Sequence, residues 1–307
     1  YGAVYERYAA DIWKYFERYV TEEDQYLPPD NIQLIPELTI AHRTSPTNIG
    51  LYLMCILAAR DFSFLSSGEM YERLDRTLST VERLEKWKGH LYNWYDTVTL
   101  ELLGEPYIST VDSGNFICTL ICLKEGIKSY IEEDTRLAAL YGRIEKLISN
   151  TDFRALYHEK KALFYLGYQP MKAAFSENYY DFHMSEARSA SYYAVSAGIV
   201  PKKNWRMLSR KITEKQHRIG CLSWTGTAFE YFMPCLWLPT PKGSFIDEAL
   251  SFAYEMQRQK TIAINRKGME AQRIYGVSES AFFEFDREMN YQYRAFGVQS
   301  LGLKRGL

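Results

Sequence analysis

The stretch Tyr179-Tyr-Asp-Phe-His-Met-Ser-Glu-Ala-Arg188 places one glutamate, Glu186, ahead of a run of small residues. We expect Glu186 to lie in the first turns of a helix that ends near residue 197. Small side chains allow neighbouring elements to approach such a helix closely. A carboxylate there is therefore expected to face a crowded interior or a cleft rather than open water. The small residues are Ala187, Ser189, Ala190, Ser191 and Ala194.

The composition of the 307-residue chain is that of an ordinary globular protein, with 47% hydrophobic and 24% charged residues. A net charge of −1 argues against nucleic acid as the main partner, because phosphate binding favours a basic surplus. The unusual feature is an aromatic content of 15%, with 25 tyrosines. Aromatic rings stack on sugar rings and phenol hydroxyls bind sugar hydroxyls, so a sugar cleft is favoured. Half-buried tyrosines between helices would also account for most of them individually.

Cysteine usage and hydropathy indicate the setting of the chain. The five cysteines are scattered and lie mostly within apolar runs, so we expect reduced core residues in a cytoplasmic setting. Neither cysteines nor histidines show metal-ligand spacing, and we expect no metal or other cofactor. The longest apolar runs have eight or nine residues, whereas a membrane-spanning helix needs about 20. No direct membrane contact by this segment is therefore expected.

Helical periodicity dominates the chain. Helix starts are predicted from an N-cap at Ser45, a capping box of Ser66 and Glu69, and a cap at Ser244 with Asp247. Residues 88–110 are predicted as a long irregular loop, and residues 152–168 as a short β-hairpin. Alternating apolar and amphipathic helices, joined by aromatic-rich loops, predict an all-α toroid of the (α/α)6 type. About nine or ten helices are found where twelve are needed, so we expect a barrel that is incomplete at the C-terminus. The predicted helices are 4–20, 46–60, 66–84, 111–130, 132–148, 186–197 and shorter ones after residues 201, 223, 243 and 276, the last through Tyr293.

Seven blocks in order along nearly the whole chain resemble the glucoamylase-like central domain of the cyclic β-1,2-glucan synthases. The resemblance implies an (α/α)6 barrel and retaining transglycosylation on β-1,2-glucan, while related endo-β-1,2-glucanases hydrolyse with inversion on the same barrel. The blocks are Ala41–Tyr52 (AHRTSPTNIGLY), Gly89–Asp96 (GHLYNWYD), Ser109–Asn115 (STVDSGN), Asp181 with Ser185–Arg188 (SEAR), Leu222–Tyr231 (LSWTGTAFEY), Val277–Ser280 (VSES), and Tyr291–Gly297 with Leu301–Gly306.

The same resemblance predicts the domain organisation. Synthases of this family carry a membrane-embedded glycosyltransferase before the domain and a phosphorylase-like domain after it. We therefore expect residues 1–307 to form a single glucoamylase-like domain, a fragment of a larger inner-membrane protein whose other domains are candidate partners.

Glycosidic bond cleavage needs two carboxyl groups, one to protonate the leaving oxygen and one to attack the anomeric carbon or activate water. The resemblance places the acid/base on Glu186 and the nucleophile on Glu279. The alternative for Glu186 is a buried salt bridge with Arg188 or Arg43. For Glu279 it is a carboxylate at a helix N-terminus, favoured by the helix dipole. The acids that remain once solvated charge runs are excluded are Glu186, Glu230 and Glu279, with Asp96, Asp112 and Asp181 in support.

Candidate glucan contacts lie mostly in the matched blocks. Helix capping is the alternative for Asp112 and Asn115, and core packing is the alternative for Trp94. His42 and His90 are candidates either for sugar binding or for a structural role. Glu230 is expected either to contact sugar or to support residues that do. The predicted substrate-binding residues are Arg43, Asn48, Tyr92, Asn93, Trp94, Asp96, Asp112, Asn115, Tyr180, Asp181, Arg188, Trp224 and Glu230.

Three functional hypotheses follow. The leading one is a retaining transglycosylase acting on linear β-1,2-glucan. The second is an inverting β-glucan hydrolase on the same barrel. The third is a glucan-binding module without catalytic activity.

Overall fold

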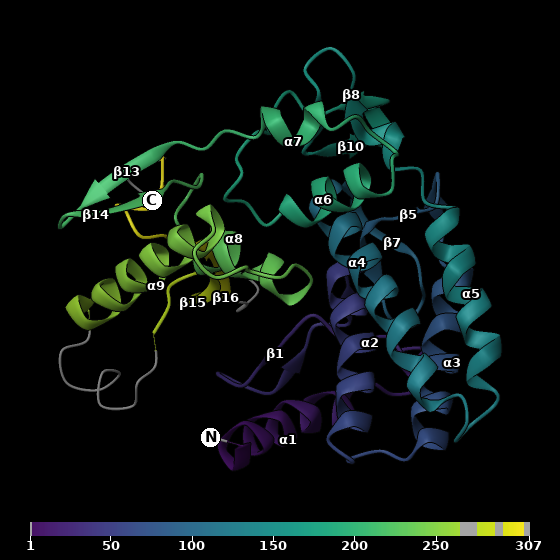
Figure 1. Ribbon diagram of the computed structural model, residues 1–307. Helices are drawn as coiled ribbons and strands as arrows, with labels where there is room; N and C mark the ends of the chain where they lie inside the picture. Colours follow the sequence, from purple (N-terminus) through teal and green to yellow (C-terminus); the bar gives the residue numbers. More distant parts are fainter. Residues whose placement is uncertain (1, 265–274, 286–290, 304–307) are drawn as a thin grey trace. The chain divides into compact units, whose positions relative to one another are not determined.

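The computed structural model describes residues 2–264, 275–285 and 291–303 (Figure 1). The chain forms two compact units, which are described separately. Unit 1 comprises Tyr1–Tyr157 and Phe164–Asn178, and unit 2 comprises His158–Leu163 and Tyr179–Leu307. The chain therefore passes between the units three times. No helix of the described ranges is long and apolar enough to cross a lipid bilayer.

The helical part of unit 1 follows the predicted order (Figure 1). Helix α2 contacts α1, α3 and α4, and α5 packs against α3 and α4. Ser45 caps α2 by accepting from the backbone N–H of Asn48, and Ser66 and Glu69 form the predicted capping box of α3. The helices are α1 (Gly2–Tyr19), α2 (Pro46–Asp61), α3 (Ser67–Arg83), α4 (Thr110–Gly126) and α5 (Leu137–Ser149), with 3₁₀ turns η1 (Ile127–Tyr130), η2 (Phe153–Leu156) and η3 (Pro170–Lys172).

Unit 1 also contains a five-stranded sheet of order β11-β10-β7-β6-β3, so the all-α prediction is wrong here. The predicted loop 88–110 holds the antiparallel pair β6–β7, in which the fully buried Tyr95 faces Leu102. The predicted hairpin at 152–168 is confirmed by β8 (Tyr157–His158) and β9 (Leu163–Tyr165), which are hydrogen-bonded neighbours, whereas β10 joins the larger sheet. The strands are β1 (Ile32–Gln33), β2 (Thr39–Ile40), β3 (Arg43–Thr44), β4 (Lys86–Trp87), β5 (His90–Leu91), β6 (Asn93–Asp96), β7 (Leu102–Ser109), β10 (Gly167–Gln169) and β11 (Ala174–Phe175); β8 (Tyr157–His158) and β9 (Leu163–Tyr165) flank a passage between the units.

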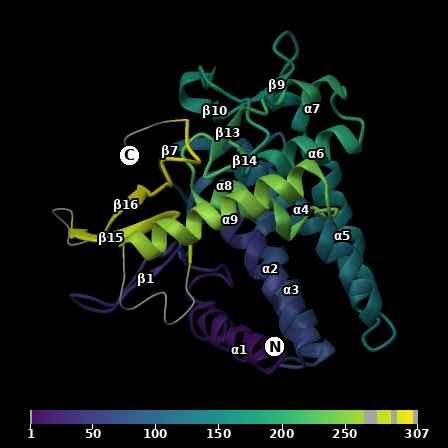
Figure 2. The same cartoon turned by 60° about the vertical axis from the view of Figure 1, so that its left-hand side comes forward.

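Unit 2 is built around the long helix α9, which contacts α8 and β14 (Figure 2). Ser244 and Asp247 cap α9 as predicted, since the Ser244 hydroxyl accepts from the Asp247 N–H. The elements are β12 (Tyr179–Tyr180), α6 (Arg188–Ser196), α7 (Lys203–Met207), β13 (Ile212–Lys215), β14 (Arg218–Cys221), α8 (Ala228–Phe232), the 3₁₀ turn η4 (Met233–Leu236), α9 (Phe245–Ile264), β15 (Glu279–Phe285) and β16 (Tyr291–Ala295).

The last predicted helix of unit 2 is wrong. Residues 279–285 and 291–295 form the antiparallel hairpin β15–β16, with Glu279 opposite Ala295. The Ser-Glu-Ser sequence resembles a helix start, but the aromatic-rich segment that follows it favours a strand.

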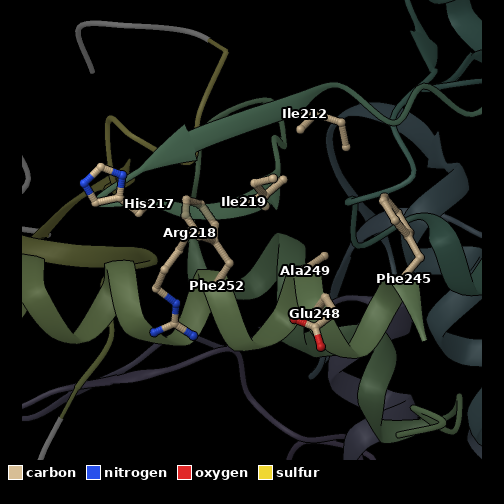
Figure 3. A pocket seen from close by; sticks show the side chains of 9 residues that line it. Ile212, His217, Arg218, Ile219, Phe245, Glu248, Ala249 and Phe252 are labelled. Carbon is tan, nitrogen blue, oxygen red and sulfur yellow. The ribbon is translucent and has the colours of Figure 1, made fainter. Parts of the chain in front are cut away.

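Strand β14 lies directly on α9. A Cβ atom at Gly220 would stand 2.0 Å from Cδ1 of Phe252, so only glycine fits this contact. Beside it lies a pocket of about 520 Å³ between the β13–β14 hairpin and α9 (Figure 3). Its lining residues include Ile212, Arg218 and Glu248 but none of the candidate carboxylates.

Candidate active site

Glu186 lies on a turn that leads into α6, and the prediction that it belongs to the first turns of the helix is wrong. The Ser185 hydroxyl accepts from the Ala187 N–H at 3.1 Å, a local bond that competes with helix formation. It also donates to Oε2 of Glu186 at 3.1 Å. The preceding segment is extended and pairs with Ser209, whose N–H donates to the Asp181 carbonyl.

The environment of Glu186 raises its pKa from 4.5 to about 7. Burial is the main cause, and the negative charge of Glu230 acts in the same direction. Glu279 adds a weaker effect of the same sign, while the hydrogen bond from Ser185 opposes it. A carboxyl group with this pKa can give and take a proton near neutral pH.

Glu279 is the first residue of β15, so the helix-dipole alternative for it is wrong. The Ser278 hydroxyl donates to Oε2 of Glu279 at 2.6 Å and accepts from the Phe229 N–H at 2.9 Å. One hydroxyl therefore connects this carboxylate to the first turn of α8. The Ser280 hydroxyl donates to the Ala281 carbonyl instead.

Glu230 is the anchor of the loop 223–227. It lies in the first turn of α8, with Thr227 as its capping-box partner, and is only 4% exposed. Its two oxygens accept so many protein donors that little capacity remains for a sugar hydroxyl, so the site uses it to support the loop. The donors are the hydroxyls of Ser223 (2.9 Å), Thr225 (2.7 Å) and Thr227 (3.3 Å), and the backbone N–H groups of Trp224 (3.1 Å), Thr225 (3.1 Å), Gly226 (2.8 Å) and Thr227 (3.0 Å).

The supported loop presents Trp224, which is 36% exposed. Its indole Nε1 donates to Oδ1 of Asp181 at 3.1 Å, and its ring lies 5.1 Å from that of Phe182. Burial raises the pKa of Asp181. Tyr180 is half-buried in the neighbouring β12. Trp224 and Asp181 thus form an aromatic and polar pair in the same unit as both proposed catalytic glutamates.

Arg188 is buried, with 2% exposure, and burial lowers its pKa. Its Nη1 donates to the His183 carbonyl at 3.4 Å and to the Met184 sulfur at 3.3 Å. Within the described part of unit 2, no ion pair joins it to Glu186. The salt-bridge alternative for Glu186 is therefore wrong for Arg188, which stabilises the turn before α6.

In unit 1, the Asp30 carboxylate binds two of the residues that are predicted to contact the glucan. Its carboxylate accepts from Arg43 Nη2 at 3.1 Å and from Asn48 Nδ2 at 3.0 Å. The Arg43 guanidinium lies 5.5 Å from the centre of the Trp94 ring. Trp94 is half-buried, so core packing does not account for all of its surface. Asp30 itself was missed, although it follows two prolines in a loop where a carboxylate has no capping role.

Thr47, at the start of α2, joins two more candidates. Its hydroxyl donates to Oδ1 of Asp112 at 2.6 Å and accepts from Nδ2 of Asn115 at 3.2 Å. Ser109 caps α4 by accepting from the Asp112 N–H, so the capping alternative for Asp112 and Asn115 is wrong. Asn115 is 2% exposed, whereas Asp112 is half-buried.

The other candidates of unit 1 are held by local contacts. Asp96 accepts from the N–H groups of Val98 and Thr99 in the turn after β6. Tyr92 is buried and Asn93 half-buried. Both nitrogens of His90 bind protein groups and burial lowers its pKa to about 4, which favours the structural alternative for it. His42 binds Asp24 at 2.7 Å.

The structure thus brings Asp181, Glu186, Trp224, Glu230 and Glu279 together in unit 2. Unit 2 also holds Tyr180 and Arg188, and the remaining candidates lie in unit 1. Sequence reasoning missed the contributions of Ser185, Ser223 and Gln257. Ser185 adjoins Glu186 and could have been found from that position, whereas Ser223 stands seven residues before Glu230. No local pattern distinguishes a buried glutamine on α9. No three His, Cys, Asp or Glu side chains among the described residues are arranged to hold a metal ion.

Comparisons with known proteins agree with this fold. The cyclic β-(1,2)-glucan synthase NdvB of Rhizobium meliloti (strain 1021) is a homologue, 28% identical over 421 aligned positions. The alignment covers 97% of this chain, which spans only 15% of the length of that curated relative. The resemblance to the synthases is thereby confirmed.

Solved structures give the fold. A putative glucoamylase from Bacteroides fragilis NCTC 9343 has a TM-score of 0.73 and 17% identity, over 95% of this chain and 74% of its own. The endo-β-1,2-glucanase of Chitinophaga pinensis, in complex with sophorotriose and glucose, has a TM-score of 0.69 and 15% identity, over 94% of this chain and 72% of its own. The fold is therefore glucoamylase-like. The family model described as "Protein of unknown function (DUF3131)" matches residues 7–179, more than half of the chain, and the chain belongs to that family.

Proposed function

We propose that this chain is a carbohydrate-active domain that acts on β-1,2-glucan by retaining transglycosylation. The observation that carries the proposal is Glu186, a carboxyl group whose pKa is raised to about 7 by burial and by two neighbouring carboxylates, one of which is Glu279. Two carboxyl groups in different surroundings are what glycosidic bond exchange requires. The homology to the synthase supplies the substrate class.

In the proposed reaction, the Glu279 carboxylate attacks the anomeric carbon while Glu186 donates its proton to the leaving glycosidic oxygen. A glycosyl ester on Glu279 results. Glu186, now ionised, takes the proton of an incoming 2-hydroxyl, whose oxygen attacks the anomeric carbon and releases Glu279. When that hydroxyl belongs to the same glucan chain, the product is a ring. The net configuration stays β because each of the two displacements inverts it.

The glucan would stack on Trp224 and bind polar groups that include Asp181. Arg43, Asn48, Trp94 and Asp112 are proposed as the glucan-binding residues of unit 1. Retention requires the two carboxyl groups to stand about 5 Å apart, whereas inversion needs about 6.5–9.5 Å.

We also propose that both units form one glucoamylase-like domain, with an (α/α)6 barrel completed by further helices. The domain would belong to a longer inner-membrane synthase and lie on its cytoplasmic side. Other domains of that synthase would be its partners.

The test is incubation of the chain with linear β-1,2-glucan, with products followed by mass spectrometry and anomeric configuration by NMR. Cyclic or redistributed chains of β configuration, absent with Glu186→Gln and Glu279→Gln, would support the proposal. Short products released in the α configuration would identify an inverting hydrolase instead. Glucan binding without any bond exchange, also in a chain extended at the C-terminus, would identify a binding module.

A further inference from the structure

One side chain of α9 connects the two loops that carry the proposed chemistry. Gln257 is 2% exposed. Its Nε2 donates to the carbonyl of Gly226 at 3.0 Å, in the loop wrapped around Glu230. Its Oε1 accepts from the N–H of Val277 at 2.7 Å, two residues before Glu279. The amide therefore spans from the loop that presents Trp224 to the segment that presents Glu279.

A second contact from the same face of α9 strengthens the hold on the Glu279 segment. Thr261 lies one helical turn after Gln257 and on the same face. Its hydroxyl accepts from the Gly276 N–H at 3.1 Å and donates to the Gln257 carbonyl at 3.0 Å. Two consecutive backbone N–H groups, those of Gly276 and Val277, are thus fixed to one helix.

The Gly226 carbonyl, which the Gln257 side chain binds at its other end, is also constrained. The Gly226 carbonyl also accepts from the Val298 N–H at 3.0 Å. Gly226 has a φ of +79°, and a Cβ atom there would stand 2.5 Å from the Val298 carbonyl oxygen. This carbonyl therefore has little freedom to move, and the position of Gln257 fixes the distance between the two loops.

We propose that Gln257 is a positioning residue, which holds the Glu279 segment against the Glu230 loop so that nucleophile and acid keep one fixed separation. The inference rests on the proposed function for the roles of Glu279 and Glu186. An amide suits this place because one partner is an acceptor and the other a donor. An ionised carboxylate would repel the Gly226 carbonyl. A thioether would leave the Val277 N–H unpaired and the Gly226 carbonyl with only the Val298 N–H as donor.

The first test compares Gln257→Met with Gln259→Met. Methionine keeps the volume of glutamine but removes both bonds. Because a misplacement of about 1 Å can lower a rate about 100-fold, we expect kcat to fall by about 10- to 100-fold while KM changes less than about threefold. Gln259 lies on the same helix and bonds to Gln216 and Glu255 away from the site, so its variant should keep kcat within about twofold.

The second variant, Gln257→Glu, gives a signature that a merely structural role would not produce. When protonated, the introduced carboxyl group donates through its O–H and accepts through its carbonyl, as the amide does. When ionised, it only accepts. We therefore expect the ratio of variant to wild-type kcat to rise at least tenfold as pH falls from 8 to 5. The titration of Glu186 cancels in this ratio, because it affects both proteins.

Hydrogen exchange at the Val277 amide separates this inference from the proposed function. Loss of protection in Gln257→Met, but not in Gln259→Met, supports the positioning role of Gln257 even if the wild-type chain shows no glucan turnover. In that case only the proposed function fails. Unchanged Val277 protection in Gln257→Met, or an active wild type whose kcat survives both Gln257 substitutions at every pH, overturns the inference.

Discussion

The raised pKa of Glu186 carries a stability cost that a single substitution should reveal. In the folded chain its pKa is about 7, compared with an ordinary value of 4.5. Between these two pH values the folded state holds a proton that the unfolded state has released. The free energy of unfolding therefore falls as pH rises from about 4.5 through 7. Below that window Glu186 is protonated in both states and carries no cost.

Glu186→Gln removes this titration while keeping the size of the side chain and an acceptor for the Ser185 hydroxyl. A rise in pKa from 4.5 to about 7 corresponds to about 3–4 kcal/mol, at about 1.4 kcal/mol per pKa unit. We expect the variant to be about 2–3 kcal/mol more stable than the wild type at pH 8, because the half-buried side chain keeps some contact with solvent. At pH 4 the two proteins should be equally stable.

The assay is urea unfolding at pH 4, 6 and 8, followed by tryptophan fluorescence and circular dichroism. If the two units unfold in separate transitions, we expect the difference in free energy of unfolding in the transition of unit 2, which contains Glu186. The matched control is Glu214→Gln on the exposed face of β13, which should change stability by less than about 0.5 kcal/mol at any pH. A gain that is the same at pH 4 and pH 8, or a loss at pH 8, would refute the reasoning.

Further predictions concern activity and packing. The alkaline limb of the pH profile of kcat/KM should lie near pH 7, where Glu186 loses its proton, and Glu230→Gln should move it to lower pH because a negative charge is removed. Trp224→Ala should raise KM for β-1,2-glucan several-fold in initial-rate measurements, while Trp224→Phe should keep most of the stacking. Gly220→Ala should destabilise the chain by about 1–3 kcal/mol in urea unfolding, because the new methyl group meets a phenyl ring of α9. Gly142→Ala, in α5 with nothing within 4 Å, should instead stabilise it by about 0.5–1 kcal/mol.

Local signals predicted the elements whose formation depends on local bonds. The cap at Ser45, the capping box at Ser66 and the cap at Ser244 all stand where the sequence indicated. These features need only a side chain and a backbone N–H three residues later. The hairpin β15–β16 was missed because its strands depend on each other, and the cap-like Ser-Glu-Ser pattern at its start favoured a helix.

The candidate site also combines contacts that the local sequence predicts with contacts that depend on distant partners. Ser278 could be predicted as a partner of Glu279, because the two are adjacent in sequence. Gln257 could not, because its two partners lie 31 and 20 residues away and its neighbours on α9 are ordinary core residues. The saturation of Glu230 by loop donors also depends on a tertiary fold of the loop, so the sequence left its role open.

The order in which the chain alternates between its units has a consequence for synthesis on the ribosome. All residues of unit 1 have been added once the chain reaches Asn178, so this unit can begin to fold before most of unit 2 exists. The six residues His158–Leu163 are made early but belong to unit 2. The Ala162 carbonyl accepts from Nδ2 of Asn204, and the His158 ring contacts Tyr179. Some of the partners of this short loop are therefore translated up to 42 residues after it.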